Sequence, residues 1–306
     1  MKDDYLWDGS GEADPAVLRL ESVLGQLRLK HSKAPVPRMR WIPGAAAACL
    51  LAGVALWQAT SVPSPPDTAW KIGDRALTAG EVVITGAGET RSLWAEGFGQ
   101  VELEPSGEMR ISESRSGYHR FDLRAGTMHA LILAPPGAFV VDTPSSRAVD
   151  LGCQYTLSVD RRGNGTLDVE SGWVAFLHAG MESFVPAGAR CLTTRDAGPG
   201  IPFFRDAPAG LAEAARRFAE TRSETAMREI LDNARKEDAL TVWHVMTRTK
   251  GRQRGMAFER LTQLVSVPAE VTAERIERGE EAAIDLCWNA LGLESAQWWR
   301  GWRRNW

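Results

Sequence analysis

The chain has 306 residues, a formal net charge of −3 at pH 7, and a hydrophobic share of 44%. This length predicts one or two domains, and the apolar share is normal for a chain with a packed core. The small negative net charge argues against a general nucleic-acid binder, so no direct contact with nucleic acid is expected.

Residues 1–40 are predicted to form a cytoplasmic segment with one short amphipathic helix. Asp14 followed by Pro15 is a favourable helix start, because it supplies a capping oxygen and then a proline at the first helical position. One face then carries four apolar residues at helical spacing, namely Val17, Leu20, Leu24 and Leu27. Because so short a helix does not bury this stripe by itself, the stripe is predicted to bind a cytoplasmic protein, a second copy of itself or the membrane surface.

An uncharged stretch, WIPGAAAACLLAGVALW, extends from Trp41 to Trp57. Its length suits one helix across a bilayer, and tryptophans stand at both ends, where interfacial aromatics belong. Residues 41–60 are therefore predicted to be a transmembrane helix. A buried helix of a soluble protein and a cleaved secretory segment are the alternatives.

The charges beside this stretch predict an orientation. Residues 28–40 contain five basic residues and no acidic one, whereas Thr60 to Thr68 contains no Lys or Arg. The positive-inside rule therefore predicts a single-pass protein of the inner membrane, with residues 1–40 in the cytoplasm and the bulk in the periplasm. Residues 61–68 are predicted to be a stiff, Pro-rich spacer.

Residues 69–205 are predicted to form an all-β domain, either a sandwich or a short solenoid. Apolar or alternating runs recur about every ten residues and are separated by Gly- and Pro-containing turns. No helical pattern interrupts them, so a parallel α/β sheet is not expected. The expected strands are 81–85, 100–104, 118–123, 127–133, 139–141, 155–159, 166–170 and 173–177.

Residues 206–306 are predicted to form an α-helical domain, either a small bundle or a stack of helices. The expected helices are 211–218, 227–234, 239–246, 256–264 and 281–291. The predicted fold class is thus α+β multidomain, with a transmembrane helix, an all-β domain and a helical region.

The last residues, SAQWWRGWRRNW, place Trp298, Trp302 and Trp306 four apart. This segment could touch lipid head groups or an anionic wall polymer, or its tryptophans could pack on the helical bundle.

The sequence contains none of the motifs HExxH, GxSxG, GxxxxGK[ST] or paired CxxC. The five histidines are scattered and do not have metal-ligand spacing. We therefore expect no enzyme activity, no catalytic residue, no cofactor and no metal. The acids Asp142, Asp150 and Asp160 are predicted to form turns at strand ends. Cys153 could form a disulfide with Cys191, with buried free thiols as the alternative.

The order of turns and strands between about residues 80 and 195 resembles that of the FecR-domain family. The matching stretches are Thr143-Pro144, Gly152-Cys153-Gln154-Tyr155, Val169-Glu-Ser-Gly-Trp-Val174 and Val185-Pro-Ala-Gly188. The predicted motif residues are Thr143, Pro144, Gly152, Cys153, Tyr155, Gly172, Val174 and Gly188. They are mostly Gly, Pro and apolar positions, which specify a fold rather than a catalytic set.

The resemblance implies a membrane-anchored regulator that passes an extracytoplasmic signal to a cytoplasmic partner, expected to be a sigma factor. Its outer partner would be an extracytoplasmic protein or envelope component. The alternative is an anchored binding or scaffold module without a signalling role. Some FecR-like regulators also cleave themselves at a Gly-Thr bond. Here Cys153 replaces the threonine, and its thiol could attack the Gly152 carbonyl or could simply be packed.

Overall fold

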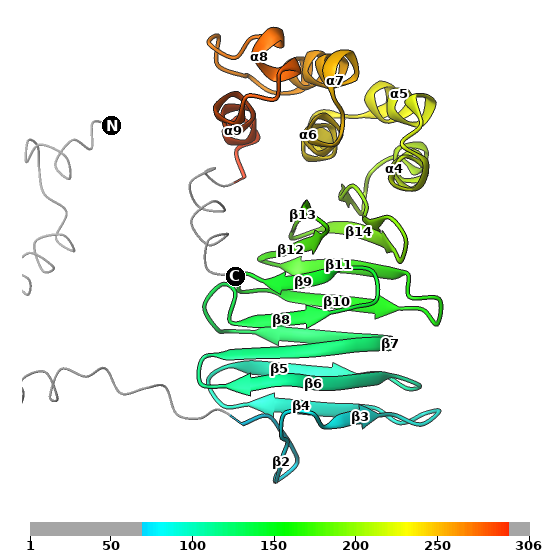
Figure 1. Ribbon diagram of the computed structural model, residues 1–306, viewed down its shortest axis with the longest axis vertical. Coiled ribbons are helices and arrows are strands. Elements are labelled where there is room, and N and C mark those ends of the chain that lie inside the picture. Colours follow the sequence, from blue (N-terminus) through cyan, green and yellow to red (C-terminus); the bar gives the residue numbers. More distant parts are fainter. Residues whose placement is uncertain (1–68, 294–306) are drawn as a thin grey trace, which may run out of the picture. The chain divides into compact units, whose positions relative to one another are not determined.

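The computed structural model describes residues 69–293, which belong to one compact unit. Strands occupy the first part of this range and helices the second (Figure 1). The strands are β1 (Lys71–Ile72), β2 (Arg75–Ala76), β3 (Val82–Ile84), β4 (Arg91–Ala95), β5 (Gly99–Leu103), β6 (Glu108–Arg115), β7 (Tyr118–Ile132), β8 (Phe139–Asp142), β9 (Arg147–Asp150), β10 (Gln154–Val159), β11 (Gly165–Ser171), β12 (Trp173–His178), β13 (Met181–Pro186), β14 (Ala189–Thr194), β15 (Gly198–Pro199) and β16 (Phe203–Phe204). The helices are α4 (Ala209–Thr221), α5 (Glu224–Asn233), the 3₁₀ turn η1 (Lys236–Asp238), α6 (Ala239–Arg248), α7 (Gly251–Leu264), α8 (Ala273–Glu277) and α9 (Glu281–Asn289).

Within this range the strands join into one 16-stranded sheet, antiparallel except where β7 and β8 run parallel. The long strand β7 belongs to both halves of the sheet. Its residues 118–125 pair with β6 and β8, and its residues 126–132 pair with β5 and β10. Gly126 lies where β7 changes its partner strands. It has φ +101°, and the Gly107 Cα lies only 2.5 Å from where a Cβ on Gly126 would be. Only glycine fits such a position, so this residue allows the strand to pass from one half to the other.

The two halves of the sheet bury alternate side chains in a common core. Trp70, Phe121, Phe139 and Tyr155 are among its largest aromatic members, and all are nearly inaccessible to solvent. The rings of Trp70 and Phe121 meet edge to face, with centroids 5.1 Å apart. Since side chains alternate along a strand, the outward residues remain polar on most strands. Burial of each large apolar side chain stabilises the fold by roughly 2–3 kcal/mol.

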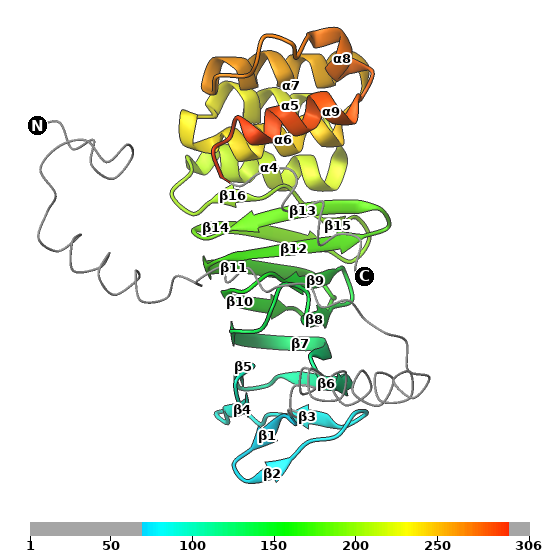
Figure 2. The same ribbon diagram turned by 90° about the vertical axis from the view of Figure 1, so that its left-hand side faces the viewer.

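A second core joins the strands to the helices, which stack on one end of the sheet (Figure 2). The strands β8, β12 and β13 have runs of consecutive buried residues, so they are apolar on both faces. Val140, Ala175 and Phe184 face the helices and pack in the same cluster as Phe218 and Trp288. These strands therefore need the helical layer to keep their second face from water.

Arg248 of α6 connects the helices to the sheet by hydrogen bonds. Its guanidinium donates to the carbonyls of Glu182 (3.0 Å) and Pro199 (3.1 Å) and to the Ser183 hydroxyl (2.6 Å). Burial, followed by repulsion from Arg222, lowers the pKa of Arg248 to about 10. This side chain hydrogen-bonds polar groups at the end of the sheet that the helices cover.

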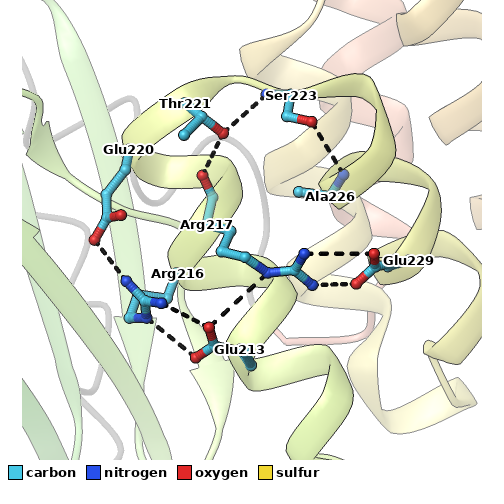
Figure 3. A network of polar contacts seen from close by, with 8 residues as sticks. All are labelled: Glu213, Arg216, Arg217, Glu220, Thr221, Ser223, Ala226 and Glu229. Carbon is cyan, nitrogen blue, oxygen red and sulfur yellow. Dashed lines mark hydrogen bonds and ion pairs between the residues drawn. The ribbon is translucent and has the colours of Figure 1, made fainter.

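The turn between α4 and α5 is organised by side chains that Figure 3 shows. The Ser223 hydroxyl caps α5 by accepting from the Ala226 N–H (3.5 Å), and the Thr221 hydroxyl accepts from the Ser223 N–H (3.2 Å). Arg217 of α4 forms an ion pair with Glu229 of α5. Exposed ion pairs contribute little individually, so the cap is the stronger determinant of where α5 begins.

The five predicted helices are confirmed by α4, α5, α6, α7 and α9, whereas α8 was not predicted. The runs at 118–123 and 127–133 are one continuous strand instead of two. Strands give way to helices between β16 and α4, close to the predicted border at residue 205.

The predicted fold class is wrong. Residues 69–293 form one compact unit with one large sheet, instead of an all-β domain followed by a separate helical domain. The physical reason is the shared core, since the helices bury their apolar faces against the sheet. In the described range, no helix has both the length and the apolar character needed to cross a membrane. The transmembrane helix predicted at 41–60 lies outside the described residues, as do the segments 1–40 and 61–68.

Candidate functional site

A tight turn, Asp150 to Cys153, connects β9 to β10. Gly152 has φ +85°, a left-handed conformation that favours glycine. The Asp150 carboxylate accepts a hydrogen bond from the Gly152 N–H (2.7 Å to Oδ1) and another from the Cys153 thiol (2.5 Å to Oδ2). The same carboxylate therefore fixes the turn and contacts the thiol.

Both side chains of this pair are buried, with Asp150 1% and Cys153 3% exposed. Burial raises the pKa of Asp150 to about 7, although the hydrogen bonds from Cys153 and Gly152 oppose the rise. Burial also raises the pKa of the Cys153 thiol well above its usual value, and the Asp150 charge adds to that effect. At neutral pH the thiol is thus protonated, while the carboxyl group lies near its midpoint.

Gly172, in the turn between β11 and β12, packs directly on the Gly152–Cys153 peptide. It has φ +71°, and a Cβ here would clash with the Gly152 carbonyl oxygen and lie 2.9 Å from Cys153 Cβ. The Gly172 carbonyl in turn accepts from the Ala187 N–H (3.0 Å), in the turn before Gly188. Three turns that are distant in sequence therefore meet at one end of the sheet.

The structure places most of the predicted motif residues at one end of β9, and Thr143 and Pro144 at its other end. Gly152, Cys153, Gly172 and Gly188 belong to these three adjoining turns, and Tyr155 follows on β10 as a buried residue. Val174 is buried in β12 as part of the core between the two halves of the sheet.

Thr143 and Pro144 lie at the opposite end of β9, in the turn that follows β8. The Thr143 hydroxyl accepts from the Ser146 N–H (3.0 Å) and donates to the Ser146 carbonyl (2.9 Å). Pro144 packs against Gly163, which lies in the turn between β10 and β11. The role of this pair is therefore to shape turns.

A cavity of about 520 Å³ adjoins Thr143 and Pro144. Its lining includes Asp142, Thr143, Arg147, His178 and Glu182. Asp142 forms ion pairs with Arg120 and Arg147, the latter at 2.8 Å. A cavity of this size and polarity suits a small polar ligand or a partner side chain.

The sequence predicted Asp150 only as a turn former and missed its bond to Cys153. The spacing Asp-Leu-Gly-Cys could have indicated it, because an aspartate that accepts from the N–H two residues further along a turn, here Gly152, also brings its carboxylate close to the next residue, Cys153. Asp160 forms a turn as predicted, accepting from the N–H groups of Arg162 and Asn164. The possible Cys153–Cys191 disulfide is not formed, since both thiols are free and buried.

Chemically, the turn from Asp150 to Cys153 offers a thiol, a carboxyl group able to take the proton of that thiol, and an adjoining peptide bond.

The partner-binding residues predicted in the cytoplasmic segment lie outside the described residues. They are Val17, Leu20, Leu24 and Leu27.

No protein-family model matches the chain, and no curated protein matches it. Among solved structures, two crystal structures of a protein titled "putative anti-sigma factor" from Parabacteroides distasonis ATCC 8503 are similar, at 15% identity and a TM-score of 0.36. The likeness covers 44% of this chain and 63% of that one. At this TM-score the likeness does not establish a shared fold.

Proposed function

We propose that the protein is a FecR-like regulator in which residues 1–40 bind a cytoplasmic sigma factor and residues 69–293 receive a signal in the periplasm, at the inner membrane. The observation that supports this proposal is the contact between Gly152 and Gly172. These motif positions are twenty residues apart, yet they pack together without room for a side chain. Such a contact explains why the motif has glycine at position 172, and the proposed function is inferred from the resemblance that the motif carries.

Capture of a cytoplasmic partner tests the inner half of the proposal. Full-length protein should capture a sigma factor, and Leu20→Asp with Leu24→Asp should abolish capture because both changes charge the apolar stripe. Ser22→Asp with Gln26→Asp, which adds the same charge off the stripe, should leave capture intact. If residues 1–40 can be deleted with no change in transcription, the signalling role is wrong and an anchored binding module remains.

The periplasmic location has its own test. A reporter enzyme that is active only outside the cytoplasm, fused after residue 306, should be active. Activity of a cytosol-specific reporter at that position, together with recovery of the chain in the soluble fraction, would contradict the location.

A second candidate function is self-cleavage at the Gly152–Cys153 bond, favoured by the hydrogen bond between the Cys153 thiol and Asp150. The Asp150 carboxylate takes the thiol proton, and Sγ adds to the Gly152 carbonyl carbon. The C–N bond then breaks as the Cys153 nitrogen receives that proton, which leaves a thioester between Gly152 and the cysteine side chain. Water hydrolyses the thioester to a Gly152 carboxylate and a free thiol.

Gel analysis of the full-length chain tests this step. Two fragments, 1–152 and 153–306, should appear, and Cys153→Ala should abolish them. Asp150→Asn should slow their formation, because the amide is not a base, whereas Cys191→Ala should have no effect. A single full-length band under all conditions would show that Cys153 is only a packed residue.

A further inference from the structure

Met181, the first residue of β13, follows the tight turn of the β12–β13 hairpin. The two turn residues, Ala179 and Gly180, have φ +46° and +79°, and His178 pairs with Met181 across the turn. A two-residue turn with two positive φ values matches the twist of its strands, so it fixes the geometry of the hairpin. The hairpin therefore holds Met181 in a defined position beside the helices.

Two arginines from the helical layer donate to the Met181 sulfur. Arg222, between α4 and α5, lies 3.4 Å from Sδ through Nη2, and Arg248 of α6 lies 3.5 Å from it through Nη1. Burial lowers the pKa of both guanidinium groups, and for Arg248 repulsion from Arg222 adds to the effect. Two cations from different helices therefore share one uncharged acceptor.

These two guanidinium groups differ from others on the same helices in what they bind. Arg217 of α4 forms an ion pair with Glu229, whereas within residues 69–293 neither Arg222 nor Arg248 forms an ion pair with a carboxylate. The charge of Glu182 acts on Arg248 only as the smallest influence on its pKa. Arg222 Nη1 is buried without a hydrogen-bond partner. Because a thioether sulfur is a weak acceptor, this pair of cations lacks a strong one.

The Met181 side chain is within reach of small molecules. It is only partly buried, and it lines both the cavity of about 520 Å³ beside Thr143 and a second cavity of about 360 Å³ between the hairpin and the helices. A molecule as small as hydrogen peroxide has room in either cavity. An oxidant can therefore approach this methionine without unfolding of the protein.

We propose that Met181 is a site of reversible oxidation, at which Arg222 and Arg248 bind the oxygen of the methionine sulfoxide. The oxidant is a peroxide. The sulfur attacks one peroxide oxygen and the O–O bond breaks, so that sulfur loses the two electrons that the peroxide gains. With hydrogen peroxide, the departing hydroxide takes the proton of the transferred oxygen and leaves as water. Sulfoxide reductases return such a sulfoxide to methionine.

Oxidation at this position strengthens the junction between sheet and helices. A sulfoxide oxygen is a strong acceptor, and hydrogen bonds from charged donors are stronger than neutral ones. One oxygen on β13 then joins Arg222, at the α4–α5 turn, to Arg248 of α6. Oxidation of a methionine ordinarily disrupts its packing, so a stabilising oxidation distinguishes this site from other methionines. Neither the site nor its test depends on the proposed function.

Peroxide treatment of the full-length protein tests the site. Peptide mass mapping should find sulfoxide at Met181, and the urea midpoint of the treated protein should rise by about 0.5 M. Met181→Leu treated in parallel should show no rise, which excludes oxidation elsewhere as the cause. A midpoint that is unchanged or lower once Met181 is oxidised would overturn the proposal. Sulfoxide at Met256 of α7, which is also partly buried, without sulfoxide at Met181 would overturn it as well.

A pair of variants tests the arginine contacts without an oxidant. Glutamine carries an oxygen on its δ atom, as the sulfoxide does, so Met181→Gln should have a urea midpoint about 0.5 M above that of Met181→Leu. Adding Arg222→Gln to both variants should remove this difference.

Met256 provides the matched control, because its sulfur accepts no hydrogen bond within residues 69–293. Met256→Gln should be less stable than Met256→Leu, since a polar group there replaces an apolar one. A midpoint for Met181→Gln at or below that of Met181→Leu would contradict the assignment.

Discussion

Asp150 holds a carboxyl group inside the protein, and this makes stability depend on pH. Its pKa of about 7 is higher than the unfolded value, so the folded state binds the proton more tightly. The contribution of Asp150 to the free energy of unfolding is fully present below the pKa of the unfolded state, and it is lost as pH rises through 7. In Asp150→Asn this loss should disappear, while the bond from the Gly152 N–H can remain.

Urea unfolding at pH 5.5 and pH 8 measures the effect. Relative to Asp150→Asn, the unaltered protein should lose about 2 kcal/mol of unfolding free energy over this interval. An equal pH dependence in the two proteins would show that Asp150 does not titrate in this range.

His119 gives the opposite dependence. Burial lowers its pKa to about 4, its Nδ1 lies 3.0 Å from the Ser114 hydroxyl, and its Nε2 has no hydrogen-bond partner. Because the pKa of His119 is lower in the folded state than in the unfolded state, its contribution to the free energy of unfolding is present above pH 6.5. This contribution is lost as pH falls towards 4. The loss should be about 3 kcal/mol.

His119→Phe should reduce this acid loss, since phenylalanine has no charge to bury and can keep the ring contacts with Trp70 and Phe98. Thermal unfolding at pH 4.5 and pH 7 compares the two proteins. A variant that loses as much stability in acid as the unaltered protein would contradict the assignment to His119.

At the scale of elements, the turn glycines differ in what a side chain would meet. Gly172 and Gly180 both have a positive φ, but only a Cβ at Gly172 would clash with backbone atoms. Gly180→Ala should therefore cost only about 1–2 kcal/mol for the left-handed conformation. Gly172→Ala should cost at least about 3 kcal/mol, since the Gly152 turn must also move. Urea midpoints of the two variants test the difference, and equal midpoints would contradict the contact.

At the scale of the whole molecule, the shared core predicts that the strands do not fold alone. A fragment of residues 69–205 would expose Val140, Ala175 and Phe184, which face the helices. It should bind a hydrophobic dye and unfold without a cooperative transition, whereas residues 69–293 should unfold in one step. A monomeric, cooperatively folded 69–205 fragment would contradict the single unit.

The sequence by itself determined where most of the described helices and strands lie, because residue periodicity and turn glycines act locally. It also identified Gly152, Cys153 and Gly172 as motif positions, from their order in the resemblance to FecR domains. It predicted two strands where β7 is one, because an isolated Gly126 resembles a break until the close approach of Gly107 is known.

Only the tertiary structure decided that strands and helices form one unit, since the second apolar face of β8 and β12 acquires its partner from helices that begin more than thirty positions further along the chain. It also decided the environment of Asp150. A sequence shows an acid at a strand end, whereas burial by the adjoining turns raises its pKa and places its carboxylate on the Cys153 thiol.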